Sequence, residues 1–280
     1  MNATGKINEA RKLLDAARIE GLSVGFVPTM GALHDGHVSL VRRAREENGF
    51  VAVSIFVNPT QFGAHEDLSK YPRTFADDLD MCMTAGVDLV FHPDSDEMYP
   101  EPSKTRIVIE GLTEPMEGRF RPGHFEGVAL VCAKLFDVVG PCSAYFGEKD
   151  AQQLRVVARM VRDLDMPVEV VPCPTVRDAD GLALSSRNRY LSVSDRSRAL
   201  SLRRALRSVE DGVANGQRES SVLLIDARQL LDADAVDYLE IVDPVTLQPV
   251  ATVEGAVLVC GAIRLGETRL IDNVTVGGKR

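Results

Sequence analysis

The first part of the chain alternates between two patterns of apolar and polar residues. Residues 7–17 carry apolar side chains three or four positions apart, which predicts an amphipathic helix that ends at Gly21. A continuous apolar run follows at 23–27, then a helical pattern at 36–47 and a second apolar run at 51–57. Apolar strands separated by a helix are typical of a parallel sheet covered on both faces, so we expect a βαβ unit here.

The same alternation continues through the next hundred residues. The pattern predicts helices at 77–85, 127–139 and 151–164, and short strands at 87–91 and 168–171. Strands and helices that take turns in this way indicate an α/β fold, a doubly wound parallel sheet.

The pattern changes after Pro172-Cys-Pro174, where two X-Pro units favour extended backbone and mark a domain boundary. Apolar positions at 199–213 predict one long amphipathic helix, and three short segments at 236–242, 256–262 and 270–276 predict a small antiparallel sheet. This second part is therefore expected to be a smaller α+β domain.

The predicted organisation is a Rossmann-like domain over residues 1–175, which binds the substrates, and a C-terminal lid domain over residues 176–280. Such a lid would combine a helix with an antiparallel sheet.

Composition narrows the classes of function. With 45% hydrophobic and 26% charged residues, the chain resembles an ordinary globular protein, which excludes collagen-like and disordered classes. A net charge of −9 argues against a nucleic-acid partner, which needs a basic face, although a local cation cluster can still bind a small anion. We find no apolar stretch long enough to span a membrane and no signal peptide, so we expect a cytoplasmic protein with no membrane partner.

The densest chemical signal is Pro28-Thr-Met-Gly-Ala-Leu-His34-Asp-Gly-His37, between the first long strand and the next helix. In an open α/β sheet this is where a phosphate meets a helix N-terminus. Gly31 and Gly36 would let the backbone approach a ligand, and His34 and His37 could donate hydrogen bonds to phosphoryl oxygens. Two capping or surface histidines, or a metal-binding pair, are the alternatives.

Two further segments follow predicted strands or short apolar runs. The amides of Asn58 and Gln61 could bind a small polar substrate, unless Asn58 instead caps a turn that begins with proline. Lys149 and Asp150 precede the helix at 151–164, where the ammonium could neutralise phosphate and the carboxylate could hold a divalent ion or a ribose hydroxyl.

Two loops rich in arginine and one acidic pair complete the set. Residues 118–127 form either an anion-binding loop or a solvated basic loop, and residues 177–188 contain a Ser-Ser-Arg run that suits a triphosphate, unless it is only a capped turn. Asp77-Asp78 is a weaker metal candidate, because acidic residues at a helix start usually complement the helix dipole. We expect the histidine turn and the Ser-Ser-Arg loop to converge on one triphosphate.

Taken in order, these motifs resemble the pantothenate synthetase (pantoate–β-alanine ligase) family, in the nucleotidylyltransferase-like group with a His-x-Gly-His motif. The similarity runs from Pro28 to Asn188 and extends to the Ile-Val-Asp-Pro-Val-Thr-Leu segment at 241–247. One departure is Ala151, where an aromatic residue is common in the family.

The resemblance implies a reaction. ATP and pantoate form an enzyme-bound pantoyl adenylate with loss of pyrophosphate, and the amine of β-alanine then displaces AMP to give pantothenate. It also implies Mg²⁺ with ATP and a homodimer. A nucleotidylyltransferase that acts on a phosphorylated acceptor stays open as the alternative, weakly disfavoured because Gln61 and Gln153 are neutral amides.

The resemblance further implies roles for single residues. His37 would be the proton donor with His34 beside it, and Lys149 and Arg187 would neutralise phosphates as further catalytic residues. The implied ATP contacts are Met30, Gly31, Ala32, Leu33, His34, Asp35, Gly36, His37, Gly147, Glu148, Lys149, Asp150, Val176, Leu184, Ser185, Ser186 and Arg187. The implied substrate contacts are Gln61, Gln153, Asn58, Tyr71 and His124, and Asp77 is similar to a magnesium contact.

Overall fold

A computed structural model describes residues 1–63, 66, 68–101 and 103–278 of the chain. The chain divides into two compact units. The first unit consists of Met1–Thr113, Arg121–Glu148 and Gln153–Val176, and the second of Glu114–Phe120, Lys149–Gln152 and the chain from Arg177 on. The second unit thus includes two short earlier segments, and the domain boundary expected at residues 175 and 176 stays a prediction.

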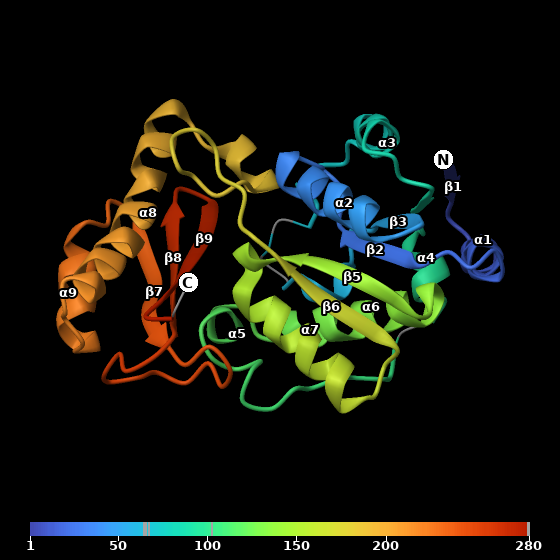
Figure 1. Ribbon diagram of the computed structural model, residues 1–280. Coiled ribbons are helices and arrows are strands. Elements are labelled where there is room, and N and C mark those ends of the chain that lie inside the picture. The colour runs from blue at the N-terminus through green and yellow to red at the C-terminus, as the bar shows by residue number, and fades with distance from the viewer. Residues whose placement is uncertain (64–65, 67, 102, 279–280) are drawn as a thin grey trace. The chain divides into compact units, whose positions relative to one another are not determined.

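A parallel sheet forms the centre of the first unit (Figure 1). Its strands are β1 (Asn2–Thr4), β4 (Leu89–Phe91), β3 (Phe50–Ile55), β2 (Val24–Thr29), β5 (Cys142–Gly147) and β6 (Val168–Cys173), in that spatial order. The strand order reverses between β2 and β5, which is the switch point outside whose carboxyl ends ligands of doubly wound sheets bind. The predicted α/β fold is confirmed.

Helices cover both faces of this sheet. They are α1 (Ile7–Ile19), α2 (Asp35–Glu47), α3 (Phe75–Thr84), α4 (Ser95–Met98), α6 (His124–Val139) and α7 (Ala151–Asp163), with the short 3₁₀ turns η1 (Pro59–Gln61) and η2 (Glu148–Asp150). Helices α2 and α3 lie on one face of the sheet and α6 and α7 on the other, as Figure 1 shows. The central strands β2, β3 and β4 are mostly apolar because helices cover both of their faces.

Most predicted elements of this unit lie within about three residues of their expected positions, but β1 and β5 differ. The three residues of β1 are too few to show a period, although they pair with β4 along the sheet edge. In β5, Ser143 breaks the apolar run, yet this residue pairs with Gly25 of β2 and Glu169 of β6. Pairing with neighbours distant in sequence, rather than local pattern, determines these two strands.

The second unit contains an antiparallel sheet of β7 (Ala235–Val242), β8 (Val257–Leu265) and β9 (Thr268–Val276), as predicted. Its helices are α5 (Glu117–Phe120), α8 (Val193–Ala214) and α9 (Ser220–Gln229), with the 3₁₀ turn η3 (Ser186–Tyr190). The long helix α8 packs on β8 and β9 through an apolar core that includes Leu206 and Ile263. A β-carbon at Gly261 would lie 2.6 Å from Leu202 Cδ1, so glycine permits this close packing.

No helix in the described part of the chain combines the length and the apolar composition that crossing a bilayer requires.

Candidate active site

The His-x-Gly-His motif forms the turn from β2 into α2. His34 is the N-cap of α2, and its Nδ1 accepts a hydrogen bond of 3.1 Å from the backbone N–H of Gly36. His37 follows in the first helical turn, and the two imidazole rings lie 4.1 Å apart between centroids. Both rings are half-buried, and Asp35 between them is exposed. The capping role considered for His34 is therefore present, and it brings both imidazoles together beside the switch point.

A buried aspartate fixes the backbone of this turn. Asp78 of α3 is 2% exposed, and its two carboxylate oxygens accept hydrogen bonds from the backbone N–H groups of Ala32 (3.0 Å) and Leu33 (2.8 Å). Gly31 and Ala32 both have positive φ angles, of 79° and 51°. For alanine this conformation costs about 1–2 kcal/mol, which the two hydrogen bonds offset.

The metal candidate predicted at this helix lies beside that anchor. Asp77 is exposed in the first turn of α3, whereas Asp78 is buried on the face that also carries Cys82. The four-residue spacing of Asp78 and Cys82 on the buried face is the signal in the sequence that could have identified Asp78. Across the residues that the structure describes, no group of three or more His, Cys, Asp or Glu side chains is arranged to bind a metal ion.

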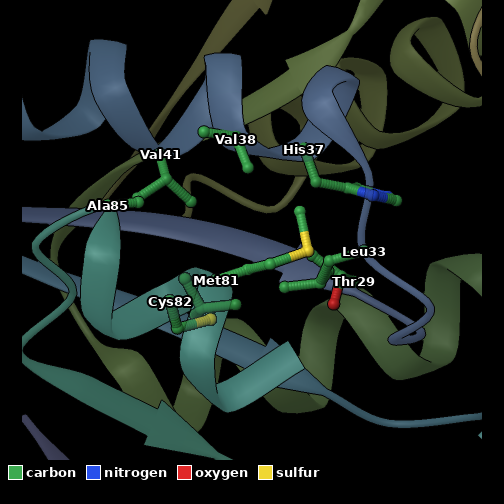
Figure 2. Close-up of a pocket in the computed structure, with 9 residues that line it drawn as sticks. Thr29, Leu33, His37, Val38, Val41, Met81, Cys82 and Ala85 are labelled. Atoms are coloured by element: carbon green, nitrogen blue, oxygen red, sulfur yellow. The ribbon is translucent and has the colours of Figure 1, made fainter. Parts of the chain in front are cut away.

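An apolar crevice lies between α2 and α3 next to His37 (Figure 2). Its lining consists of Thr29, Leu33, His37, Val38, Val41, Val53, Met81, Cys82 and Ala85. Burial, together with the neighbouring Asp78 carboxylate, raises the pKa of the Cys82 thiol to about 11. The thiol therefore stays protonated at neutral pH, and the crevice supplies packing around the imidazole rather than a nucleophile.

The turn after β3 brings together two of the predicted substrate contacts. Asn58 is 1% exposed, and its side-chain Nδ2 donates to Gln61 Oε1 over 3.1 Å while its Oδ1 accepts from the backbone of Thr60. Asn58 therefore caps η1, the simpler of its two interpretations, and orients the Gln61 amide. Gln61 Nε2 in turn contacts Met30 Sδ at 3.1 Å, which joins the turns after β2 and β3.

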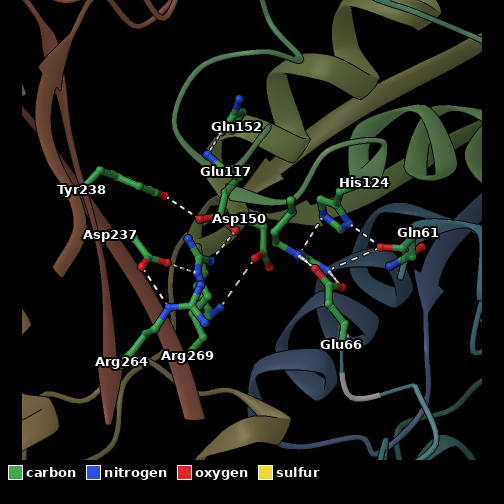
Figure 3. Close-up of polar contacts among 12 residues, drawn as sticks. Gln61, Glu66, Glu117, His124, Asp150, Gln152, Asp237, Tyr238, Arg264 and Arg269 are labelled. Atoms are coloured by element: carbon green, nitrogen blue, oxygen red, sulfur yellow. Dashed lines mark hydrogen bonds and ion pairs between the residues drawn. The ribbon is translucent and has the colours of Figure 1, made fainter. Parts of the chain in front are cut away.

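His124 supports this turn from the start of α6 (Figure 3). Its Nδ1 lies 2.8 Å from the Gln61 carbonyl oxygen and its Nε2 lies 3.0 Å from Arg121 Nη1. A carbonyl only accepts and a guanidinium only donates, so Nδ1 carries the proton and Nε2 accepts. The imidazole is neutral in this arrangement and positions the backbone of Gln61.

Arg121 also forms an ion pair with Glu66. Two parallel hydrogen bonds of 2.7 Å join Nε and Nη2 of the guanidinium to the two carboxylate oxygens. Burial acts to raise the pKa of Glu66, but the Arg121 guanidinium outweighs it and leaves the pKa below its ordinary value. In the second unit, Arg119 pairs with Glu240 at 3.3 Å. The loop at 118–127 is thus built from ion pairs, not from free cations.

Helix α6 approaches the Gln61 turn without a side chain in between. A β-carbon at Gly127 would clash with the carbonyl group of Thr60 and lie 2.7 Å from Gln61 Cα.

Tyr71, another predicted substrate contact, is buried and packs edge-on against Phe62 at 5.9 Å between ring centroids. The remaining predicted positions of the first unit follow β5 or β6. They are Gly147 at the end of β5, Glu148 in η2, the half-buried Gln153 in α7 and Val176 after β6.

The other predicted phosphate contacts belong to the second unit. Lys149 Nζ lies 3.5 Å from Asp150 Oδ1. Ser185 caps η3, where its Oγ accepts from the backbone N–H of Arg187 over 3.3 Å, with the half-buried Leu184 before it and the buried Ser186 after it. Since the histidine turn belongs to the first unit, its convergence with Ser185–Arg187 stays a prediction.

A buried charged network in the second unit was not predicted from the sequence (Figure 3). Glu117 accepts from Arg269 Nη1 over 2.6 Å and from the Tyr238 hydroxyl over 2.8 Å. Arg269 Nε donates to Asp237 over 2.6 Å, and Arg264 donates to the other oxygen of Asp237 over 2.9 Å. Burial acts to lower the pKa of Arg269, but the two carboxylates outweigh it and raise that pKa. Glu117 and Arg269 are 152 positions apart, so no local pattern indicates the pair.

The family model, the curated relatives and the solved structures to which this chain is similar all belong to one family. A family model described as pantoate–β-alanine ligase matches residues 2–275. The pantothenate synthetase of Caldicellulosiruptor saccharolyticus is 48% identical over 99% of both chains. A crystal structure of the enzyme from Thermus thermophilus is 50% identical, with a TM-score of 0.93 over 98% of this chain and 99% of that one.

A further solved structure is described as a complex with ligands. The pantoate–β-alanine ligase from Francisella tularensis, complexed with β-γ ATP and β-alanine, is 33% identical with a TM-score of 0.82. The match covers 98% of this chain and 97% of that one.

Proposed function

This chain belongs to the pantoate–β-alanine ligase family and joins pantoate to β-alanine, and we propose that it does so through a pantoyl adenylate. The pantoate carboxylate attacks the α-phosphorus of ATP and releases pyrophosphate. The β-alanine amine then attacks the acyl carbon, so that the C–N bond forms, the acyl–phosphate bond breaks and AMP leaves with the electron pair. The paired imidazoles of His34 and His37 at the end of β2 are the observation that carries this proposal.

The histidine turn suits the first step because charge grows on the phosphates there. With Nδ1 of His34 accepting from Gly36, the proton of the neutral ring is on Nε2, which can donate to a phosphoryl oxygen. We assign the same function to His37. The reaction needs positioning and charge neutralisation more than a protein nucleophile, and Cys82, which lines the crevice beside His37, is a protonated thiol.

We assign pantoate to the turn after β3. The Gln61 amide is oriented by Asn58 and its backbone by His124, so that it presents neutral hydrogen-bonding groups to a hydroxy acid. Tyr71 and Gln153 are the other proposed contacts.

The proposed ATP contacts are those that the family resemblance implies. They are Met30 to His37, Gly147 to Asp150, Val176, and Leu184 to Arg187, in which Lys149 and Arg187 neutralise phosphate charge. A ligand of this kind is found in the Francisella tularensis enzyme, whose structure is described as a complex with β-γ ATP.

Magnesium would enter as part of the substrate. The described residues offer no cluster of three metal-binding side chains, and Asp77 is a single exposed carboxylate. Mg²⁺ typically binds through one or two carboxylates plus substrate phosphates, so these residues fit MgATP with Asp77 as a protein ligand and do not fit a resident metal.

Pyrophosphate exchange tests the adenylate. The enzyme with ATP, Mg²⁺, labelled pyrophosphate and pantoate, without β-alanine, should incorporate label into ATP. Pantoamide, which lacks the carboxylate nucleophile, is the matched control and should support no exchange. Exchange that does not depend on pantoate would refute the adenylate and support nucleotidyl transfer to another acceptor.

We also propose a cytoplasmic homodimer, on the family resemblance. Sedimentation equilibrium should return twice the chain mass of 30.5 kDa.

A further inference from the structure

We propose that Asp272 and Asn273, two adjacent residues of β9, are positioning residues that set Lys149 and the Ser185–Arg187 turn in a fixed relation to each other. This inference rests on the proposed function, in which both segments contact ATP. Asn273 contacts Lys149 directly, whereas Asp272 acts on the Ser185–Arg187 turn through Arg177, and all of these residues belong to the second unit.

Asn273 fixes the backbone at Lys149. Its side-chain Nδ2 donates a hydrogen bond of 2.8 Å to the Lys149 carbonyl oxygen, and the amide is 9% exposed. Lys149 lies in a short 3₁₀ turn, η2, where no strand ladder defines its position. The hydrogen bond from β9 therefore fixes the position of the Lys149 backbone. That position limits the space that the ammonium group can reach.

Asp272 fixes the other segment through Arg177. Oδ2 accepts from Arg177 Nη1 over 2.7 Å and Oδ1 accepts from Nη2 over 2.9 Å, a planar two-point contact. Arg177 forms an antiparallel bridge with Ala183 and donates to the carbonyl of Gly181 over 3.3 Å. The aspartate thereby holds the hairpin that leads directly into the Ser185–Arg187 turn.

The hairpin continues into that turn through Asn188. Its Nδ2 donates to the Ala183 carbonyl over 3.0 Å, and Ser185 caps the turn between them. The contacts thus run from Asp272 through Arg177 and Ala183 to the serine turn without a break.

Asp272 and Asn273, the two proposed anchors, are themselves joined by a hydrogen bond. The backbone N–H of Asn273 donates to Asp272 Oδ1 over 2.8 Å, so the carboxylate that binds Arg177 also orients the residue that binds Lys149. Consecutive Cα atoms are about 3.8 Å apart, which leaves little freedom between the anchors. Strand β9 is hydrogen-bonded along its length to β8 and is therefore a rigid base. A buried ion pair such as Arg177–Asp272 is weak evidence for a role in stability, so positioning is the role to be tested.

Three variants test this inference in the full chain. Asn273→Asp keeps the shape but replaces the donor by an acceptor, and Asp272→Asn removes the charge that binds Arg177. Thr275→Ala, at an exposed position of the same strand, is the matched control. The measurements are the thermal midpoint, the rate of pantoate-dependent ATP–pyrophosphate exchange, and the KM values for ATP and for β-alanine.

We expect exchange to fall roughly 10- to 100-fold in Asn273→Asp and Asp272→Asn, because misplaced charged groups lose transition-state stabilisation. The KM for ATP should rise several-fold while the KM for β-alanine stays at the parental value. Asp272→Glu, which retains the charge, should recover part of the exchange rate, and Thr275→Ala should match the parent.

The opposite results would overturn the inference. Parental exchange and parental KM for ATP in Asn273→Asp would show that the contact does not position Lys149. A loss of exchange only in proportion to the folded fraction, with unchanged KM for ATP, would show a structural role alone. If Asn273→Asp does not fold, Asn273→Gln, whose longer amide displaces the Lys149 carbonyl, is judged by the same criteria. If the parent shows no pantoate-dependent exchange, the proposed function fails, whereas parental exchange in the variants removes only this inference.

Discussion

The histidine turn of the first unit and the Lys149 and Ser185 segments of the second unit are built in different ways. In the histidine turn, consecutive residues supply the strand end, the two positive φ angles and the helix cap, and Asp78 adds an anchor from outside. In the second unit, Lys149 depends on Asn273, 124 positions later, and Arg177 on Asp272, 95 positions later. The histidine turn is thus positioned mainly by its local sequence, whereas the Lys149 and Ser185 segments are positioned by contacts with residues distant in sequence.

The largest expected effect is at the histidine turn, which its local sequence positions. Replacing His37 or His34 by alanine removes a donor to the phosphates, and each change should lower the exchange rate roughly 100- to 1,000-fold. The thermal midpoint of His37→Ala should stay near that of the parent. Arg42→Ala, exposed on the same helix, is the control and should retain full activity. Parental exchange in the double variant would end the assignment of this turn.

The second effect concerns Asp78, a residue distant in sequence that anchors the histidine turn. Asp78→Ala leaves two buried N–H groups without their acceptor, so we expect a loss of about 2 kcal/mol in the free energy of unfolding. The displaced turn should lower exchange roughly 100-fold. Urea unfolding and exchange assays measure both, with Asp80→Ala, exposed on the same helix, as the control. If Asp78→Ala matched this control in both assays, the turn would be fixed by its local sequence alone.

The third effect lies in the second unit and acts on stability. Glu117→Gln takes the negative charge away from Arg269, and removing one partner of a buried pair costs about 3 kcal/mol. We expect a lower urea midpoint, with exchange per folded molecule changed only a few-fold. Glu114→Gln offers a comparison in the same segment. A parental midpoint for Glu117→Gln would show that Arg269 and Asp237 suffice.

The smallest effect is the response to acid. The arginine partners overcome the influence of burial and hold the pKa of Glu66 below its ordinary 4.5 and that of Asp237 below its ordinary 3.8. Carboxyls with a depressed folded pKa contribute stability that is present above the unfolded pKa and lost as pH falls through the folded pKa. Stability should therefore begin to fall below about pH 4.5, and further below about pH 3.8.

Unfolding by urea at a series of pH values measures this slope. Glu66→Gln should flatten it in the upper part of the window and Asp237→Asn in the lower part. Asp211→Asn, at an exposed position of α8, should leave it unchanged. Identical slopes in all four proteins would contradict the assignment of these two ion pairs.

The sequence predicted most of the fold because most elements show a local period. The helix at 35–47 and the strands on either side of it are marked by apolar spacing, and so is the antiparallel sheet. Strand β5 was not predicted, because its pairing with β2 and β6 compensates for a polar residue in the run.

The candidate site likewise contains some residues that short motifs mark and others that only tertiary contacts reveal. His34, His37 and Gln61 stand out in short motifs at strand ends, and the structure brings the turns that carry them together through Met30. For Asp78 the sequence holds only a weak signal, its four-residue spacing from Cys82, and the packing of α3 shows that Asp78 is buried and its neighbour Asp77 is not. The contacts of Asn273 and Glu117 join positions more than a hundred residues apart, and no local pattern encodes such pairs.

The absence of a side chain at Gly127 limits how this enzyme could be redesigned. Backbone meets backbone behind Gln61, so no atom there can be trimmed to make room for a bulkier acid. If Gln61 contacts pantoate as proposed, room for a bulkier acid has to be made elsewhere than behind Gln61.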